Sequence, residues 1–290
     1  LLTSYLYKKH EYILNGQGPR PFFWRAPTDN DYGANLPVRL KAWKEASYQE
    51  PKAESFQVTP GSNATTVKVT YRFPQTEARW NITYKIYASG VIKVDNRFMA
   101  EGDQAPMIPR VGLRMQLPES FTDLTYYGRG PKENYRDRRT SQFIGEYAIP
   151  VKDMYEPYVR PQENNHRTDI YWCALTDKTQ RGLLLIADRT FELNASNYPL
   201  ESMDSGDTID NGAPRTEKTH HRHLTDPLPE KMVDLFIDYR MMGVGGDDSW
   251  GATAHEPYLI RPGKENAIEY GFSLVPFDKK EDYKYLIQQY

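Results

Sequence analysis

The sequence predicts an all-β protein, a large antiparallel β-sandwich with one or two short helices. Apolar and polar residues alternate in run after run along the chain, and such alternation is typical of strands that bury one face. The chain contains 22 Tyr, 11 Phe and 5 Trp, and aromatic side chains suit the half-buried surface of a sheet. Loops with Gly and many of the 21 Pro separate the runs. Together these features predict antiparallel sheets packed as a sandwich or a barrel.

The alternating runs define the expected strands in order. In residues 66–73, the side chains of Val67, Val69, Tyr71 and Phe73 share one face. The same period of two recurs in residues 80–86, 92–94, 111–117, 233–239 and 268–274. Each run therefore predicts a strand with one buried face.

A turn and two helical stretches complete the expected elements. Ala88-Ser89-Gly90 separates two alternating runs, which predicts a β-hairpin. Residues 35–46 repeat apolar residues at helical spacing, with Pro37 in the first turn, and predict a helix. The recurring residues are Leu36, Leu40 and Trp43. Residues 198–204 predict a second, shorter helix, and the absence of repeats or linkers predicts one domain over residues 1–290.

Composition excludes several classes of function. The formal net charge is −2, so we expect neither nucleic acid nor an anionic membrane as the main partner. No apolar run approaches the roughly 20 residues that span a bilayer, and the longest, residues 182–187, has the length of a strand. The single cysteine, Cys173, cannot form an internal disulfide, which mildly favours a reducing compartment. Because the sequence starts at Leu1 without Met or a leader, we expect a piece of a longer protein.

Four segments interrupt the strand pattern, namely residues 24–33, 126–138, 155–167 and 242–251. In the first, Asp29, Asn30 and Asp31 lie close to Gly33 and predict a tight loop, because Asp and Asn side chains bond their own backbone. This loop is interpreted either as a mobile, sugar-binding segment hinged at Gly33 or as a structural turn.

The second and third segments carry charged groups. Arg129, Glu133, Asp137 and Arg138 predict an ion-pair network packed on Tyr rings, for which a structural role is favoured. In the third segment, Glu163 and His166 lie three residues apart and form a weak candidate for an acid/base pair.

The fourth segment predicts a strained glycine turn that Asp247, Asp248 and Ser249 stabilise with side-chain bonds. Such a turn would hold Trp250 at its tip, for binding a ligand or for burial against a neighbouring domain. The run from His220 to His223 does not predict a metal site, because only alternate residues of a strand share a face and no further ligands lie nearby.

Taken together, these segments resemble the small-chain region of glycoside hydrolase family 2 β-galactosidases. Six stretches carry the resemblance in the family's order: RAPTDNDYG at residues 25–33, GRGPKENY at 128–135, DMYEPYV at 153–159, PQEN at 161–164, THHRHL at 219–224 and GGDDSW at 245–250. They span nearly the whole chain. Residues 204–215 depart from the family pattern as an insertion, and His166 lies where members vary.

The resemblance implies a galactose-mutarotase-like supersandwich at the C-terminus of a soluble bacterial β-galactosidase, in the cytoplasm or the periplasm. Two glutamates on a TIM barrel of the same polypeptide would hydrolyse β-galactosides with retention, and no barrel pattern occurs here, so no catalytic residue is assigned. The resemblance makes Trp250 a platform for the sugar and Gly33 the start of a loop over the pocket. It also implies Mg²⁺, and in some members Na⁺ or Ca²⁺, bound mostly outside this region. The oligomeric state is left open.

Two other classes of function remain open at this stage. A stand-alone carbohydrate-binding or aldose-epimerase-like sandwich would use Glu163 and His166 itself. A purely structural or oligomer-forming sandwich would cover its aromatic surface with other domains. Fold analogy alone does not choose among these possibilities.

Overall fold

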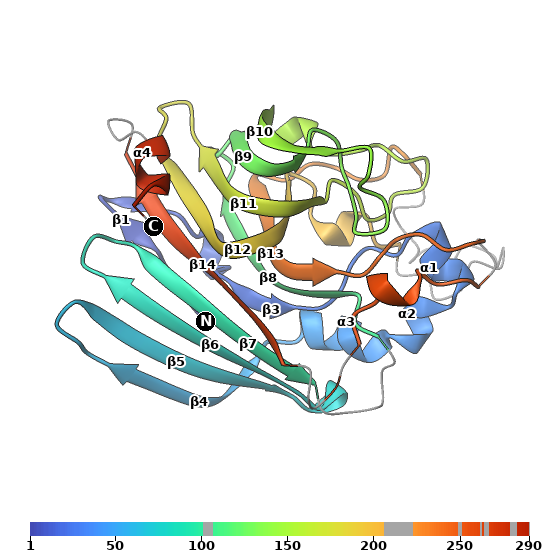
Figure 1. The fold of residues 1–290 in the computed structure, drawn as a ribbon, viewed down its shortest axis with the longest axis horizontal. Helices are drawn as coiled ribbons and strands as arrows, with labels where there is room; N and C mark the ends of the chain where they lie inside the picture. Colours follow the sequence, from blue (N-terminus) through green and yellow to red (C-terminus); the bar gives the residue numbers. More distant parts are fainter. Residues whose placement is uncertain are drawn as a thin grey trace.

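The computed structural model describes residues 1–100, 107–205, 223–248, 251–261, 263, 267–278 and 283–289. Within these residues, twelve strands form one branched sheet in which the neighbouring strands are antiparallel (Figure 1). The strands are β3 (Arg20–Phe22), β4 (Lys52–Thr59), β5 (Ala64–Phe73), β6 (Ala78–Tyr87), β7 (Ile92–Ala100), β8 (Arg110–Pro118), β9 (Asp123–Gly130), β10 (Phe143–Pro150), β11 (Arg167–Thr176), β12 (Gly182–Ser196), β13 (Met232–Met241) and β14 (Ile268–Phe277). The prediction of an all-β, antiparallel fold is confirmed.

Short elements accompany the sheet. A separate hairpin pairs β1 (Leu6–Tyr7) with β2 (His10–Glu11). The helices are α1 (Asp29–Gly33), α2 (Leu36–Arg39), α3 (Lys41–Tyr48) and α4 (Tyr283–Ile287), and the 3-10 turns are η1 (Leu14–Gly16), η2 (Pro74–Thr76), η3 (Val151–Asp153), η4 (Leu200–Ser202) and η5 (Glu256–Tyr258). None of the helices in the described part of the chain has the length and apolar character needed to cross a membrane.

Strand β12 is the point at which the sheet branches. Residues 182–187 of β12 pair with β14, whereas residues 192–196 pair with β13. One branch continues from β14 through β7, β6 and β5 to β4, and the other continues from β13 through β8 to β3. The two branches therefore diverge from one strand and can face each other as the layers of a sandwich.

An aromatic core fills the space between these layers. The ring of Phe23, which directly follows β3, lies 5.0 Å from that of Phe73, 5.5 Å from that of Trp80 and 5.4 Å from that of Phe98, measured between centroids. The latter three residues come from β5, β6 and β7. All four side chains are at least 96% buried, so the aromatic residues that predicted a sheet also hold its layers together.

The expected strands are found in β5, β6, β7, β8, β13 and β14, and the expected hairpin joins β6 to β7. Gly90 in that turn has φ 90, a conformation that glycine adopts without steric cost. The prediction of one buried face per strand is wrong for β8 and β13, which bury nearly every residue. Their polar faces can be buried because Arg114 pairs with Asp234 at 2.7 Å across the two strands.

The helical predictions need two corrections. Residues 35–46 form not one helix but α2 and α3, separated at Leu40, whose φ of −113 interrupts the helical backbone. Leu36, Leu40 and Trp43 are nevertheless all buried, as their spacing predicts. The second expected helix is only the 3-10 turn η4, and the segment that begins at Asp29, expected as a loop, is the helix α1.

Candidate functional site

The residues predicted as a pocket loop form helix α1. The side chain of Thr28 accepts a hydrogen bond from the Asp31 N–H, and the Asp31 carboxylate accepts one from the Thr28 N–H. This reciprocal capping box satisfies two of the amides that a helix start leaves unpaired, and so converts the expected loop into a helical turn. Gly33 ends the helix without positive φ, and Asn35, at φ 55, is the residue that turns the chain towards α2.

A fully buried arginine joins α1 to the glycine-rich segment at 242–248. Arg25 donates to both carboxylate oxygens of Asp31, at 2.7 and 2.9 Å. The same guanidinium donates to the carbonyl oxygens of Met242, at 2.7 Å, and Gly243, at 3.1 Å. Burial opposes the charged form of Arg25, but the charge and hydrogen bonds of Asp31 outweigh it and raise the pKa of the guanidinium. Arg25 is therefore a charged clamp between two segments that lie more than two hundred residues apart in the sequence.

Further bonds hold the next residues of the glycine-rich segment. The Asp137 carboxylate accepts from the N–H groups of Val244, at 3.2 Å, and Gly245, at 2.7 Å. The Asn30 side chain donates to the Val244 carbonyl at 3.1 Å. Backbone and side chain thus leave this segment little freedom before its turn begins.

The turn itself is described up to Asp248 and again from Gly251. Asp248 accepts from the Ala252 N–H at 3.3 Å, as predicted for a turn stabilised by its own carboxylates. A Cβ placed on Gly251 would lie 3.9 Å from the Gly33 carbonyl oxygen, so the turn lies against the end of α1. Ser249 and Trp250 fall outside the described residues, as does His221.

All four segments that interrupt the strand pattern meet around one cavity of about 270 Å³. Its lining consists of Thr28, Asp29, Asn30, Tyr135, Arg138, Tyr158, Gln162, Glu163 and Val244. Hydrogen bonds tie the segments together: the Glu163 N–H donates to the Ala26 carbonyl at 3.2 Å, and the Asn134 N–H donates to the His166 carbonyl at 2.8 Å. The convergence of these segments identifies the candidate site.

The predicted ion-pair network is present only in part. Glu133 pairs with Arg138 and also accepts a hydrogen bond from the Tyr158 hydroxyl. The Arg138 guanidinium lies 5.1 Å from the centre of the Tyr135 ring, as packing on tyrosines predicts. Arg129, in contrast, pairs at 2.7 Å with Asp169, a residue that the sequence analysis did not single out.

Glu163 and His166 do not form the acid/base pair that was considered. Both are buried, and both bond to Asn194, whose amide donates to Glu163 at 2.9 Å and whose oxygen lies 2.7 Å from His166 Nδ1. His166 Nε2 is engaged by Glu192 at 3.0 Å. Because neither ring nitrogen is available to a substrate, the geometry gives this histidine a structural role.

The sequence did not reveal the buried polar cluster behind the cavity. Arg110 bonds Asn194 at 2.9 Å and approaches Asp238 at 3.2 Å, and both charged groups are fully buried. Burial is the main cause that raises the pKa of Asp238, to about 7. Burial lowers the pKa of His166, but the hydrogen bond to Glu192 and the negative charges of Glu192 and Asp238 together outweigh burial, so the net pKa is raised. Glu192 also accepts from the Met241 N–H at 2.7 Å, so this cluster supports the end of β13 from which the glycine-rich segment starts.

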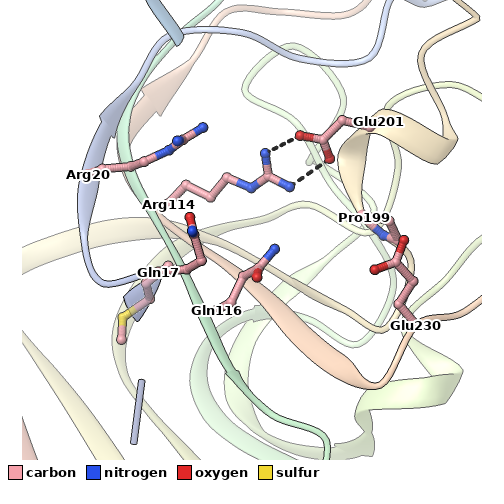
Figure 2. Close-up of a pocket in the computed structure, with 8 residues that line it drawn as sticks. Gln17, Arg20, Arg114, Gln116, Pro199, Glu201 and Glu230 are labelled. Atoms are coloured by element: carbon pink, nitrogen blue, oxygen red, sulfur yellow. Dashed lines mark hydrogen bonds and ion pairs between the residues drawn. The ribbon is translucent and has the colours of Figure 1, made fainter. Parts of the chain in front are cut away.

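A second polar cavity, of about 300 Å³, lies beside β8 and η4 (Figure 2). Arg114 points at Glu201 and binds both of its oxygens, at 2.5 and 2.7 Å. The same guanidinium also binds Asp234. Since the Arg114 guanidinium and both carboxylates are occupied with one another, we assign this cavity a structural role.

The described residues do not form a binding site for a resident metal ion. Among the described residues, no group of three or more His, Cys, Asp or Glu side chains is placed to hold one. His223, the described member of the histidine run, uses its backbone N–H to bond Asp226 at 2.9 Å.

Comparison with known proteins gives the family of the chain. Residues 1–274 match the sequence model of the family described as β-galactosidase small chain. The chain is 34% identical over 257 residues to a β-galactosidase of Priestia megaterium. That match covers 89% of this chain and 23% of the relative. A β-galactosidase of Lactobacillus delbrueckii subsp. bulgaricus is 33% identical over 260 residues, covering 89% of this chain and 24% of the relative.

Among solved structures, galactose 1-epimerase from Lactobacillus acidophilus covers 77% of this chain and 66% of its own, with a TM-score of 0.45 and 6% identity. That likeness is too distant to assign a function. The chain spans about a quarter of the length of the curated relatives it matches. From the match over residues 1–274, we conclude that this chain belongs to the β-galactosidase small-chain family.

Proposed function

We propose that this chain, residues 1–290, forms the C-terminal domain of a glycoside hydrolase family 2 β-galactosidase and completes a sugar pocket. The two catalytic glutamates would lie on a TIM barrel elsewhere in the polypeptide and hydrolyse terminal β-D-galactosides with retention. Family membership supports this proposal, and so does the length of the relatives, three quarters of which lies outside the region they share with this chain.

The observation that carries the proposal is the convergence of four non-strand segments on the cavity beside α1. The cavity volume of about 270 Å³ is smaller than that of the usual ligand site. A small cavity is what we expect if these segments form one wall of a larger pocket. Its two carboxylates already have cationic partners: Asp29 lies 3.5 Å from Arg160, and Glu163 lies 3.4 Å from Arg110. Such neutralised carboxylates act as fixed acceptors for hydroxyls better than as a nucleophile and an acid.

The proposal assigns distinct roles to the predicted residues. Asp29 and Asn30 line the cavity and would bond sugar hydroxyls. Asp31 is held by Arg25 and positions α1. Gly33 would begin the loop that lies over the pocket, and Trp250 would stack on the face of the sugar. Mg²⁺, Na⁺ or Ca²⁺, if bound in the complete protein, would take its ligands mostly outside this region, and the other domains would be the main partners of this chain.

Kinetics of the complete protein test the pocket role of the turn. Trp250→Ala should raise the KM for lactose, because stacking on one aromatic ring contributes about 1–3 kcal/mol, which is roughly a 5-fold to 150-fold change in affinity. Trp250→Phe, which keeps a ring, should recover part of that loss. Unchanged KM values for several galactosides in both variants would contradict the proposal.

A second experiment tests where the catalytic groups lie. Residues 1–290 expressed alone, and shown by circular dichroism to contain β-sheet, should not hydrolyse nitrophenyl β-galactoside. Turnover above trace levels by this piece would place catalytic carboxylates within it and refute the assignment.

A further inference from the structure

A cavity of about 750 Å³ lies where β12 changes partners. The pairing with β14 ends at Ala187 and the pairing with β13 begins at Glu192, so the two neighbouring strands separate there. Residues 188–190 are exposed in the gap. We call this cavity the branch groove; its lining shares no residue with the cavity beside α1.

On the side formed by β7 and β14, the charges of the branch groove are paired. Lys93 pairs with Asp188 and lies 3.7 Å from Asp95. These groups crowd over Gly271, where an added Cβ would come within 2.4 Å of an Asp188 oxygen. Arg97 and Glu269 pair at 3.4 Å, and Lys85 lies 3.9 Å from Asp95, so the cations and carboxylates on this side balance.

On the side formed by β12, β13 and the segment that follows β9, positive charge is left over. Arg189 forms no ion pair or hydrogen bond with any described residue. Among the described residues, Arg240 likewise has no ion pair, and the ring of Tyr239 lies 5.0 Å from its guanidinium. Arg136 reaches Glu192 at no less than 3.5 Å, and its buried Nε has no partner among the described residues.

The carboxylates on this side are already engaged. Glu192 bonds the ring of His166 at 3.0 Å and the Met241 N–H at 2.7 Å. Asp169, which also lines the groove, accepts from Arg129 at 2.7 Å and from Arg139 at 2.9 Å. Arg189 and Arg240 therefore lack a negative partner within the described part of the chain, and Arg136 shares Glu192 with His166 and a backbone amide.

We propose that the branch groove binds an oxyanion carried on a sugar-sized molecule, either a sugar phosphate or a sugar acid. Guanidinium groups bind phosphate and carboxylate oxygens through paired, charge-assisted hydrogen bonds. Asn81, Thr83 and Thr190 also line the groove and supply neutral partners for hydroxyls. A volume of about 750 Å³ lies within the range of small-molecule sites. This binding goes beyond the proposed function and needs no galactoside turnover.

Calorimetry on the complete protein tests the site with D-galactose 6-phosphate, D-galacturonate and uncharged D-galactose. At least one of the two anionic sugars should bind to the branch groove more tightly than galactose does, with affinity falling as salt rises, because the contacts are ionic. Binding of the phosphate alone would identify a phosphate ester as the ligand, and binding of the galacturonate alone a sugar acid. Failure of both anions to bind would overturn the proposal.

Arginine variants locate the binding. Arg189→Gln and Arg240→Gln should each lower the affinity for the anionic sugar about tenfold, because each removes one hydrogen bond to a charged group. Arg79→Gln removes the same charge from an exposed pair on β6 and should have no effect. Because Arg189 and Arg240 hold no structural ion pair, the melting temperature of each variant should match the parent. Unchanged affinity in the Arg189→Gln/Arg240→Gln double variant would refute the site, whatever the galactosidase assays show.

Discussion

Replacement of Arg25 by Met tests whether α1 and the glycine-rich segment form one mechanical unit. The guanidinium is 98% buried and makes two bonds to Asp31 and two to the carbonyl oxygens of Met242 and Gly243. Removing one partner of a buried ion pair costs about 3–5 kcal/mol, because the other charge is left without compensation. We therefore expect Arg25→Met to lower the free energy of opening of these segments by that amount.

Native-state hydrogen exchange of the complete protein measures this loss where it occurs. The Tyr32 N–H reports on α1 through its bond to the Thr28 carbonyl, and the Gly243 N–H reports on the second segment through its bond to the Tyr258 carbonyl. A loss of about 3–5 kcal/mol corresponds to exchange faster by roughly two to three and a half orders of magnitude at both amides.

A double variant and a control separate the clamp from general damage. The double variant Arg25→Met/Asp31→Leu should lose less opening free energy than the two single variants lose in sum, because Asp31→Leu removes the carboxylate that Arg25→Met leaves uncompensated. Arg79→Met, at an exposed ion pair on β6, should leave both amides unchanged. An acceleration below tenfold in Arg25→Met, or an acceleration confined to α1, would refute the coupling of the two segments.

Three further predictions follow from other contacts. Asp137→Ala should accelerate exchange of the Gly245 N–H about tenfold, since it removes the acceptor 2.7 Å away, whereas the exposed Asp247→Ala should not. Burial raises the pKa of Asp238 from 3.8 to about 7, so the folded protein binds this proton more tightly than the unfolded chain; stability should fall as pH rises from about 4 through about 7, and Asp238→Asn should flatten the urea midpoint over that window. An equal pH slope in both proteins would contradict this. Trp80→Ala should cost about 3–5 kcal/mol of unfolding free energy by leaving a core cavity, and Trp80→Phe less; equal losses in urea unfolding would show that ring volume is not the cause.

The sequence by itself determined the strands and the segments that interrupt them. Alternation with a period of two is a local property, since each strand places successive side chains on opposite faces. It therefore predicted β5, β6 and β14 and the hairpin after β6 without knowledge of their partners. The glycine-rich and Asp/Asn-rich segments stood out because their composition does not suit a strand.

Only the tertiary structure decided which polar residues are buried together. Arg110 and Asp238 lie on β8 and β13, more than a hundred residues apart, and the alternation in residues 233–239 puts Asp238 on the face expected to be exposed. Their burial depends on the pairing of those two strands, which no local period encodes. The same holds for Arg25, whose partner Asp31 lies nearby in the sequence while Met242 and Gly243 are brought to it by the fold.

Helix α1 shows which part of a segment's conformation can be predicted from neighbouring residues alone. The Thr28 and Asp31 side chains that cap the helix are readable in the sequence, but runs of Asp and Asn suit loops as well as helix starts. The Arg25 clamp adds a buried, charged contact that the helical arrangement satisfies. Local residues thus determined where the strand pattern breaks, whereas long-range burial and charge pairing decided what these segments form and that they meet at one cavity.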